Sequence, residues 1–455
     1  MASLFTKNFG IVNARNFESF LTGNFANMYI TIGRGRQWPN SDTVVTPVDT
    51  SNTFYDFWNN LIGIKKITAA DMNLVIPRVD WAANTKYIEY TQDTQLFVKG
   101  NTSNIAYDNK FYVRNTKDQI FKCLFNNANA NSTIMPEIAI DGQLPENAFI
   151  DTSDGYKWKY MYTIPPGLKE RFFTTQFMPV TSESIVTNNA VDGRLDILKI
   201  ITAGAGFNAN ANSNSLAIFT VTGDGSNANI TAKITTTPNT ANGGNIVGYN
   251  IISGGNNYTR ATITIVDAIK IPGTANGNVI AVIGPPGGHG SDVAQELGAS
   301  ALMVSVGIEG DESGVIPVST TGNEGFRQIG LLKDPLLAEA SNVATGTVYR
   351  ATTKYRLTEP SKNYEHQETV TTSTLSASVE FYDAANNEVY VNNIVGTVTP
   401  PQTLIGETSG AIATVVSIEE SDLKKYSGDL LYIENTAEIT RDPTETQQIK
   451  LTLRF

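Results

Sequence analysis

The residue types that most often perform acid–base or nucleophilic chemistry are scarce in this chain of 455 residues. It contains two histidines, His289 and His366, and one cysteine, Cys123. A single cysteine excludes an internal disulfide bond and a zinc site built from cysteines. His289 lies between glycines in a predicted flexible loop, which is a poor support for a catalytic base. We therefore interpret His289 as a loop or contact residue, and His366 as a solvated or interface residue.

Neighbouring carboxylates are the other candidates for chemistry. Asp151 with Asp154, and Asp311 with Glu312, each offer the two acids that a glycoside hydrolase uses. A chain with 44 Asp and Glu residues contains such neighbours by chance, so we predict no catalytic residue. No common metal or cofactor motif is present, and we expect neither a metal nor a cofactor. A Ca²⁺ or Mg²⁺ ion in a turn rich in Asp and Asn is the alternative.

Basic residues next to an aromatic ring form a third candidate. Arg34 and Arg36 flank the loop that holds Trp38, and such a group could contact a nucleotide. We favour an arginine that is buried and pairs with an acid across an interface. The stretch Gly204-Ala-Gly206 lacks the Lys-Ser/Thr of a phosphate-binding loop and is interpreted as a turn. The net charge of −11 disfavours nucleic acid as a ligand.

The composition predicts the fold class and the environment. No apolar run approaches the roughly 20 residues of a membrane-spanning helix, and the first 20 residues lack a signal-peptide pattern, so we expect neither a membrane nor export. Charged residues make up only 17% of the chain, and Asn, Thr, Gly and Ser, which favour turns and strands, replace them. The length favours two or three domains.

Residue spacing predicts the elements of the first 165 residues. Residues 13–22 have the spacing of a helix, and residues 27–33 alternate as a strand. A second helix begins at Ser51 and places four large side chains on one face, which we expect to pack in the core. Those side chains are Phe54, Phe57, Trp58 and Leu61. Strands are predicted near residues 87–90, 95–98, 110–113, 119–124 and 157–164.

An internal repeat occupies the middle of the chain. Residues 195–207 resemble residues 246–258, at a spacing of about 51 residues, and each copy reads as a strand, a Gly-rich turn and an aromatic residue. A second alternating strand follows each copy. Two such units can pair into a small β-sandwich or prism. We expect Phe207 and Tyr258 to fill its core.

The last third of the chain is rich in alternating strands. A short helix is predicted over residues 292–298 and an apolar strand over residues 300–306. The further predicted strands are residues 347–357, 377–382, 388–391 and 411–418. Residues 444–455 alternate as a half-buried terminal strand, with Phe455 docked onto the protein.

Six stretches, read in order, resemble one protein family. They are residues 30–34 with Trp38, residues 72–81, 121–124, 154–166, 325–336 and 427–435. The second contains Val75-Ile-Pro-Arg-Val-Asp-Trp81, the fifth contains Gly325-Phe-Arg-Gln-Ile-Gly330, and the series runs on to the terminal Phe455. Together they resemble the dimeric baseplate wedge subunits of T-even-type contractile-tailed phages.

The resemblance implies a mainly β protein (with a minor α+β part), a multi-layer β-sandwich core with helix-bearing loops and an inserted Gly-rich β-repeat domain. It divides the chain into a wedge core at residues 1–185 and 286–455 and an insert at residues 186–285. A small β insert is possible at about residues 385–420. The central insert is similar to Gly-rich β repeats in structural proteins of related phages, notably those of cyanobacteria.

The family also implies a function. Its members form homodimers, hold other baseplate wedge proteins together and take part in baseplate assembly and tail contraction, without catalysis. The resemblance therefore implies a location in the tail baseplate of a virion that is assembled in the host cytoplasm. The alternative, motivated by the Asn/Thr/Gly-rich repeats and the acid pairs, is a phage tail protein that binds a receptor or glycan, with processing of the glycan as a variant of that alternative.

The motif residues are predicted to have structural or interface roles. Pro77 ends an element, and Arg78 and Asp80 can pair. Arg327 lies inside an apolar strand and should meet a carboxylate, because an unpaired buried cation is costly. Gly155 makes the turn before the strand that contains Tyr156. The full set of candidates is Arg34, Trp38, Pro77, Arg78, Asp80, Trp81, Gly155, Tyr156, Trp158, Phe326, Arg327, Tyr432 and Glu434.

Overall fold

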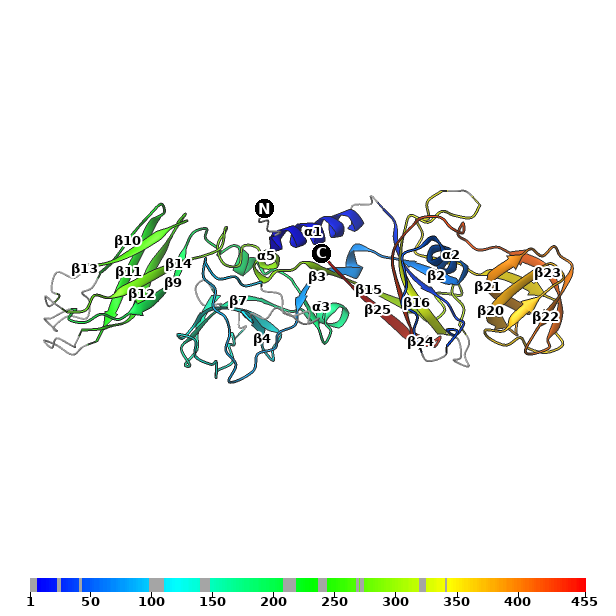
Figure 1. The fold of residues 1–455 in the computed structure, drawn as a ribbon, viewed down its shortest axis with the longest axis horizontal. Coiled ribbons are helices and arrows are strands. Elements are labelled where there is room, and N and C mark those ends of the chain that lie inside the picture. The colour runs from blue at the N-terminus through cyan, green and yellow to red at the C-terminus, as the bar shows by residue number, and fades with distance from the viewer. Residues whose placement is uncertain are drawn as a thin grey trace. The chain divides into compact units, whose positions relative to one another are not determined.

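The protein is mainly β, as predicted, and forms two compact units. The computed structural model describes residues 6–22, 26–40, 43–97, 110–139, 148–207, 218–235, 244–266, 270, 274–318, 325–339 and 342–455. Unit 1 consists of Met1–Ala14, Leu74–Ala301 and Arg454–Phe455, and unit 2 of Arg15–Asn73 and Leu302–Leu453. Figure 1 shows the elements of both. Each unit is built from segments that are distant in the sequence.

The first part of unit 1 is an antiparallel sheet with short helices. The sheet order is β4-β5-β7-β6, and β3 pairs with β8 in another sheet. The strands are β3 (Met72–Pro77), β4 (Tyr112–Arg114), β5 (Gln119–Asn126), β6 (Phe149–Asp151), β7 (Tyr156–Thr163) and β8 (Phe177–Pro179). The helices are α1 (Lys7–Thr22), which continues into unit 2, α3 (Pro166–Phe172), α4 (Ser184–Thr187) and α5 (Val293–Leu297).

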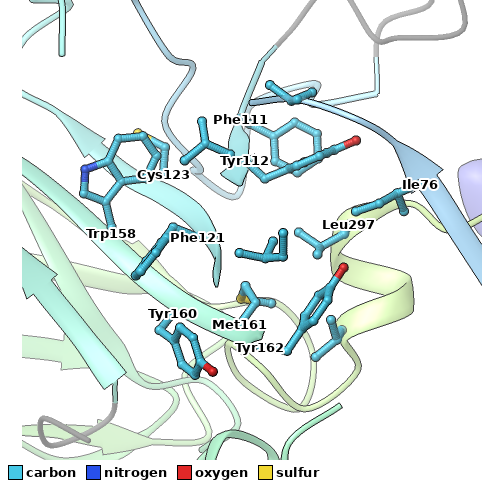
Figure 2. Packing of buried hydrophobic residues seen from close by; sticks show 14 of the residues in the cluster. Ile76, Phe111, Tyr112, Phe121, Cys123, Trp158, Tyr160, Met161, Tyr162 and Leu297 are labelled. Atoms are coloured by element: carbon cyan, nitrogen blue, oxygen red, sulfur yellow. The ribbon is translucent and has the colours of Figure 1, made fainter. Parts of the chain in front are cut away.

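Aromatic side chains fill the core beside this sheet. Figure 2 shows Phe121 of β5 and Trp158, Tyr160 and Tyr162 of β7 among the packed residues, together with Leu297 of α5. These side chains are buried, and burial of aromatic surface is the largest stabilising contribution that such residues make. The core therefore fixes α5 against the sheet.

Two of the predicted strands are wrong. Residues 87–90 and 95–97 form no strand ladder, and Val98 lies outside the described residues. Ile88 donates one backbone hydrogen bond to Lys110, and Tyr90 donates one to Cys123. Single bonds to different neighbours satisfy parts of the segment without aligning it along one partner strand. The predicted strands near residues 110, 119 and 157 are present as β4, β5 and β7.

The described residues of the Gly-rich repeat form six strands in unit 1. They are β9 (Leu195–Thr202), β10 (Ile218–Gly223), β11 (Ser226–Ile234), β12 (Ile246–Asn256), β13 (Ala261–Val266) and β14 (Asn278–Ile283). One sheet has the order β12-β11-β10-β13, and the other pairs β14 with β9. Phe207 and Tyr258 are buried in one shared core, as predicted. In the second repeat, the predicted Gly-rich turn is instead the end of β12.

Unit 2 contains a five-stranded sheet covered by a helix. The order is β17-β2-β1-β16-β24. The elements are β1 (Met28–Gly33), α2 (Ser51–Asn59), β2 (Leu61–Lys66), the 3₁₀ turn η1 (Ala69–Asp71), β16 (Gly325–Lys333), β17 (Val348–Arg350) and β24 (Asp429–Thr440). Phe57, Trp58 and Leu61 pack with Tyr29 and Leu332. This confirms the predicted helix at Ser51 and the burial of Phe57 and Trp58, but Leu61, which was predicted on the same helix face, is the first residue of β2.

A closed six-stranded barrel forms the other part of unit 2 (Figure 1). Its strands are β18 (Thr353–Leu357), β19 (Thr369–Thr371), β20 (Leu375–Asp383), β21 (Glu388–Gly396), β22 (Gln402–Gly406) and β23 (Ile412–Glu419). The strand predicted over residues 347–357 is divided, since β17 pairs with β2 and β18 pairs with β21 and β23. Ala351 lies between the two strands, and its backbone amide donates to the Ile62 carbonyl.

Two long strands complete the described elements. They are β15 (Ala301–Glu309) and β25 (Thr446–Arg454), and they are neighbours in one sheet. Gln448 donates a side-chain hydrogen bond of 2.7 Å to Ser305 between them. The terminal residue is docked through its backbone, because the Phe455 amide donates to the Ser300 carbonyl. Its ring stays exposed.

Candidate functional site

Large apolar side chains are exposed together on one part of unit 2. Three of them lie in an extended segment, residues 43–49, which we call the strap. The others come from α2, from the turn before β24 and from β24 itself. They are Val44, Val45 and Val48 of the strap with Tyr55, Tyr426 and Leu431, and they are between 39% and 61% exposed. Single exposed apolar residues are ordinary, but a group of them indicates an interaction site.

Two hollows adjoin the strap. The first has a volume of about 640 Å³ and lies between the strap, the start of α2 and residues 428–433. The second has a volume of about 580 Å³ and lies between the strap, α2 and the loop that holds Arg34 and Trp38. We call the six exposed side chains and the two hollows the strap surface.

Local hydrogen bonds hold this surface in place. Asn435 of β24 donates from its side-chain nitrogen to the Val45 carbonyl at 2.7 Å, which ties the strap to the sheet. Thr50 caps α2 by accepting from the Thr53 amide at 3.2 Å. The Tyr426 hydroxyl donates to Asn59 at 2.8 Å, and the Tyr426 ring packs edge-on against Tyr55.

Charged groups lie around the apolar centre. Arg34 pairs with Asp56 at 3.3 Å and stacks over Trp38 at 4.1 Å from the ring centroid. Burial lowers the pKa of Arg34, although Asp56 raises it in part. The first hollow is also lined by Asp49 and Asp429. An apolar centre with an acidic rim suits a protein partner that carries apolar and basic side chains.

Several predicted site residues lie at or beside this surface. Arg34 and Trp38 line the second hollow, and Tyr432 lines the first. The Tyr432 hydroxyl donates to Glu434 at 2.7 Å. Trp38 donates from its indole nitrogen to the Thr436 carbonyl at 3.0 Å. The loop and β24 therefore bring together residues that are about 400 positions apart in the sequence.

Phe326 and Arg327 lie on β16 and are buried. Arg327 pairs with Glu438 of β24 at 2.6 Å, which confirms that it meets a carboxylate. A second nitrogen of Arg327 donates to the Gly35 carbonyl. Arg327 therefore joins β16 and β24 to the loop of Arg34, which lines part of the strap surface.

The remaining predicted residues lie in unit 1. Pro77 is the last residue of β3, and Arg78 pairs with Asp80 at 2.6 Å, as predicted. Asp80 also accepts from Arg114 at 2.7 Å. Burial raises the pKa of Asp80, but the hydrogen bonds from both arginines outweigh this effect and lower it. Trp81 is half-buried and donates to Ser132 at 3.2 Å.

Gly155, Tyr156 and Trp158 also have internal positions. Gly155 adopts a φ of +84°, and a Cβ atom there would lie 2.7 Å from the Asn127 side chain, so this turn requires glycine. Tyr156 and Trp158 are buried in the aromatic core and stack on each other with ring centroids 5.4 Å apart. Whether any of these residues faces a partner stays a prediction.

Unit 1 contains a buried charged cluster that the sequence analysis did not predict. Lys122 of β5 pairs with Glu296 of α5 at 2.7 Å, and His289 Nδ1 lies 3.2 Å from the same carboxylate oxygen. The expectation that His289 is a flexible loop residue is therefore wrong. Gly288 and Gly290, on either side of it, adopt φ values of +87° and +94°, and this tight turn directs the imidazole into the core. The position of Lys122 inside an apolar strand was the sequence feature that could have indicated a buried acidic partner.

Electrostatics explain the state of this cluster. Burial alone would raise the pKa of Glu296, but the Lys122 ammonium and His289 lower it to about 2. Burial and the Lys122 charge lower the pKa of His289, so its imidazole is neutral at pH 7. All three side chains are almost fully buried, which closes the cluster to a substrate. Its role is to fasten α5 to the sheet.

Three of the four acids in the candidate pairs, Asp151, Asp154 and Glu312, have structural partners. Asp151 pairs with Lys157, and Glu312 pairs with Lys65 at 2.8 Å. Asp154 accepts from the backbone amides of Thr133 and Ile134 at 2.7 and 3.0 Å. Within the part of the chain that the structure describes, no three His, Cys, Asp or Glu side chains are grouped so that they could hold a metal ion.

Replacing Asp154 by asparagine should lower the free energy of unfolding by about 1 kcal/mol at pH 7. Burial raises the pKa of Asp154, but its hydrogen bonds outweigh this and hold it below the usual 3.8. The carboxylate therefore stabilises the fold above pH 3.8, and this contribution is lost as the pH falls through the lowered value. Urea unfolding at pH 7 and pH 3 should show the difference between the two proteins shrink. Asp151→Asn is the matched control, with a change below about 0.5 kcal/mol.

None of the helices that the structure describes combines the length and hydropathy that crossing a bilayer requires. No family model matches the chain. The chain is 25% identical over 179 residues to the baseplate wedge protein gp8 of Enterobacteria phage T4, a match that covers 34% of this chain and 52% of that protein. The chain thus spans about half the length of the curated relative that it matches. This similarity supports a baseplate-wedge-like relationship for the chain.

Proposed function

We propose that this protein is a structural subunit of a phage tail baseplate, which links neighbouring wedge proteins and takes part in baseplate assembly and tail contraction. The similarity to the wedge protein of phage T4 is the observation that carries the proposal. The proposal includes a homodimer, a location in the virion tail after assembly in the host cytoplasm, and a function without catalysis.

The strap surface supports an assembly role. Stable protein interfaces are anchored by aromatic and arginine side chains in a desolvated centre, surrounded by a polar rim. Tyr55, Tyr426 and Leu431 supply exposed apolar area, and the largely buried stack of Arg34 on Trp38 lines the hollow beside it. We propose that a neighbouring baseplate protein covers this surface.

The proposed domain arrangement follows the same reasoning. Residues 1–185 and 286–455 would form the wedge core, and residues 186–285 an insert. Strands β9 to β14 all lie inside the proposed insert and share one core, which supports its treatment as one module. The proposed small insert at residues 385–420 corresponds to β21, β22 and β23 of the barrel.

The double substitution Val48→Asp with Leu431→Asp should abolish assembly with the partner and leave the fold intact. Both side chains are exposed, so two new carboxylates cost little in the free subunit but would be desolvated in an interface. Co-sedimentation with the other wedge proteins of the parent phage should fall at least about tenfold, which corresponds to 1.4 kcal/mol. The thermal midpoint should stay within about 2 °C, equivalent to less than 1 kcal/mol.

Val416→Asp provides the matched control, because Val416 is similarly exposed but lies on the barrel. Its assembly should equal that of the unmodified chain. Equal co-sedimentation of the double variant would remove the strap surface from the proposal. The solution mass tests the dimer separately. A monomer that joins no wedge complex, or one that binds host envelope glycan, would favour the receptor-binding alternative.

A further inference from the structure

Two groups of hydrogen bonds and close contacts between the six-stranded barrel and the rest of unit 2 matter here, besides the packing of α2 near β21. The first is where the chain enters and leaves the barrel. Arg350, the last residue of β17, pairs with Glu419 at 2.9 Å and donates to the Glu420 carbonyl at 2.8 Å. Its backbone amide donates to Asp422 at 2.7 Å. This clamp joins the two chain crossings and would hold the barrel even if its other contacts opened.

The second attachment is the loop of residues 34–36. Arg36 donates to the Thr369 hydroxyl of β19 at 2.9 Å. Gly35 lies directly against Glu380 of β20, because a Cβ atom at Gly35 would be 2.1 Å from the Glu380 carboxylate oxygen Oε2. A side chain at residue 35 would therefore push the barrel away from the loop.

Glu380 is buried although its side chain points away from the barrel core. Ala377 and Val379 point into the barrel core, so the alternate residues Ser378 and Glu380 point outward from the barrel wall. Both are nonetheless buried, and Glu380 is only 5% exposed. In the described ranges, its oxygen Oε1 has no hydrogen-bond partner. The same holds for the hydroxyl of Ser378.

Two other titratable groups face this carboxyl group, Arg36 from the loop and Arg327 from β16. His366 contacts the backbone of the same residue, since its Nδ1 lies 2.8 Å from the Glu380 carbonyl oxygen. Both arginines are directed to other partners, Arg36 to Thr369 and Arg327 to Glu438. Burial raises the pKa of Glu380 to about 8, against the lowering effects of the Asn392 amide and both arginines.

We propose that Glu380 is a latch: its buried carboxyl group, seated against Gly35, holds the barrel on the loop of residues 34–36 and releases it on ionisation. Ionisation in place would leave a charged oxygen buried without a partner, which costs several kcal/mol. Opening exposes the carboxylate to water, while the Arg350 clamp keeps the barrel tethered. This inference does not depend on the proposed function.

The pH dependence has a definite sign. In the closed state the pKa of Glu380 is about 8, and in the open state the usual value of 4.5 applies. The closed state therefore binds the proton more tightly, and its advantage is complete below pH 4.5. Between pH 4.5 and pH 8 the opening equilibrium should rise by up to about tenfold for each pH unit. Above pH 8 it should level off.

A thiol reporter under the latch tests this. Ser378→Cys places a thiol of similar size at a position that is only 1% exposed, so that it reacts with a thiol reagent only when the latch opens. The native Cys123 is fully buried in unit 1, and the unmodified chain provides the blank. The comparison is with the same reporter in Glu380→Gln, which keeps the shape of the neutral carboxyl group and cannot ionise.

Both proteins carry the same thiol, so the ratio of their labelling rates removes the pH dependence that comes from ionisation of the thiol itself. We expect the labelling rate of the protein that retains Glu380, divided by the rate of the Glu380→Gln protein, to rise at least about tenfold between pH 6 and pH 8. A ratio that does not change with pH would overturn the latch. Faster labelling of the Glu380→Gln protein at every pH would show an ion pair with Arg36 or Arg327 instead, and would also overturn it. Matching circular dichroism spectra establish that both proteins are folded.

Discussion

Replacing Lys122 by alanine is expected to lower the free energy of unfolding of unit 1 by about 3–5 kcal/mol. The Lys122 and Glu296 side chains are 1% and 4% exposed, and their charged atoms lie 2.7 Å apart. Removal of the ammonium group leaves the Glu296 carboxylate buried with only neutral donors, among them the Gly290 amide. Urea unfolding of both proteins at pH 7, followed by fluorescence, measures the change.

The double variant Lys122→Met with Glu296→Gln distinguishes a stranded charge from lost packing. Methionine fills most of the lysine volume, and glutamine keeps an oxygen that can accept from Gly290. Replacing both partners of a buried ion pair is often nearly neutral, so we expect recovery of more than half of the lost stability. A double variant as unstable as Lys122→Ala would contradict this account and point to packing as the source.

Replacing Trp158 by alanine should cost about 3–5 kcal/mol, the range for a large aromatic residue in a packed core. Its ring is fully buried on β7, edge-on to Tyr87 at 5.5 Å and stacked on Tyr156 at 5.4 Å between centroids. Alanine would leave a cavity between these two rings and remove both aromatic contacts. Urea unfolding followed by circular dichroism measures the effect.

Trp158→Phe is the matched control for this position. The Trp158 indole nitrogen is buried and has no hydrogen-bond partner among the residues that the structure describes. Phenylalanine removes that unsatisfied donor while keeping an aromatic ring, so the cost should stay below about 1.5 kcal/mol. Equal losses for the two variants would mean that Trp158 acts through its nitrogen and not through its packing.

Local sequence patterns predicted the elements that are specified by residues close together in the sequence. The spacing of Phe57 and Trp58 predicted the buried face of α2, and Thr50 caps its start. The short helix at residues 292–298 is present as α5, with Asp292 and Gly298 as its caps. The acid partner of Arg327 was also predictable, because the cost of an unpaired buried charge depends only on its burial in an apolar strand.

The same argument could have been applied to Lys122. It lies between Phe121 and Cys123 in a run as apolar as that around Arg327, so a buried anionic partner was to be expected. The identity of that partner was not predictable. Glu296 is 174 residues away, and His289 joins the pair only because a turn of glycines with positive φ directs it inward.

By itself, the sequence determined the β-rich class, the positions of most strands, the shared role of Phe207 and Tyr258, and the resemblance to wedge proteins. Tertiary structure alone decided that residues 353–419 close into a barrel, that residues 347–357 divide between two sheets, and that the strap lies beside β24. The physical reason is that periodicity and capping depend on neighbours along the chain. Strand partners, and the groups that bury Glu380, are chosen among distant segments that compete for the same edges and surfaces, and no local pattern encodes that choice.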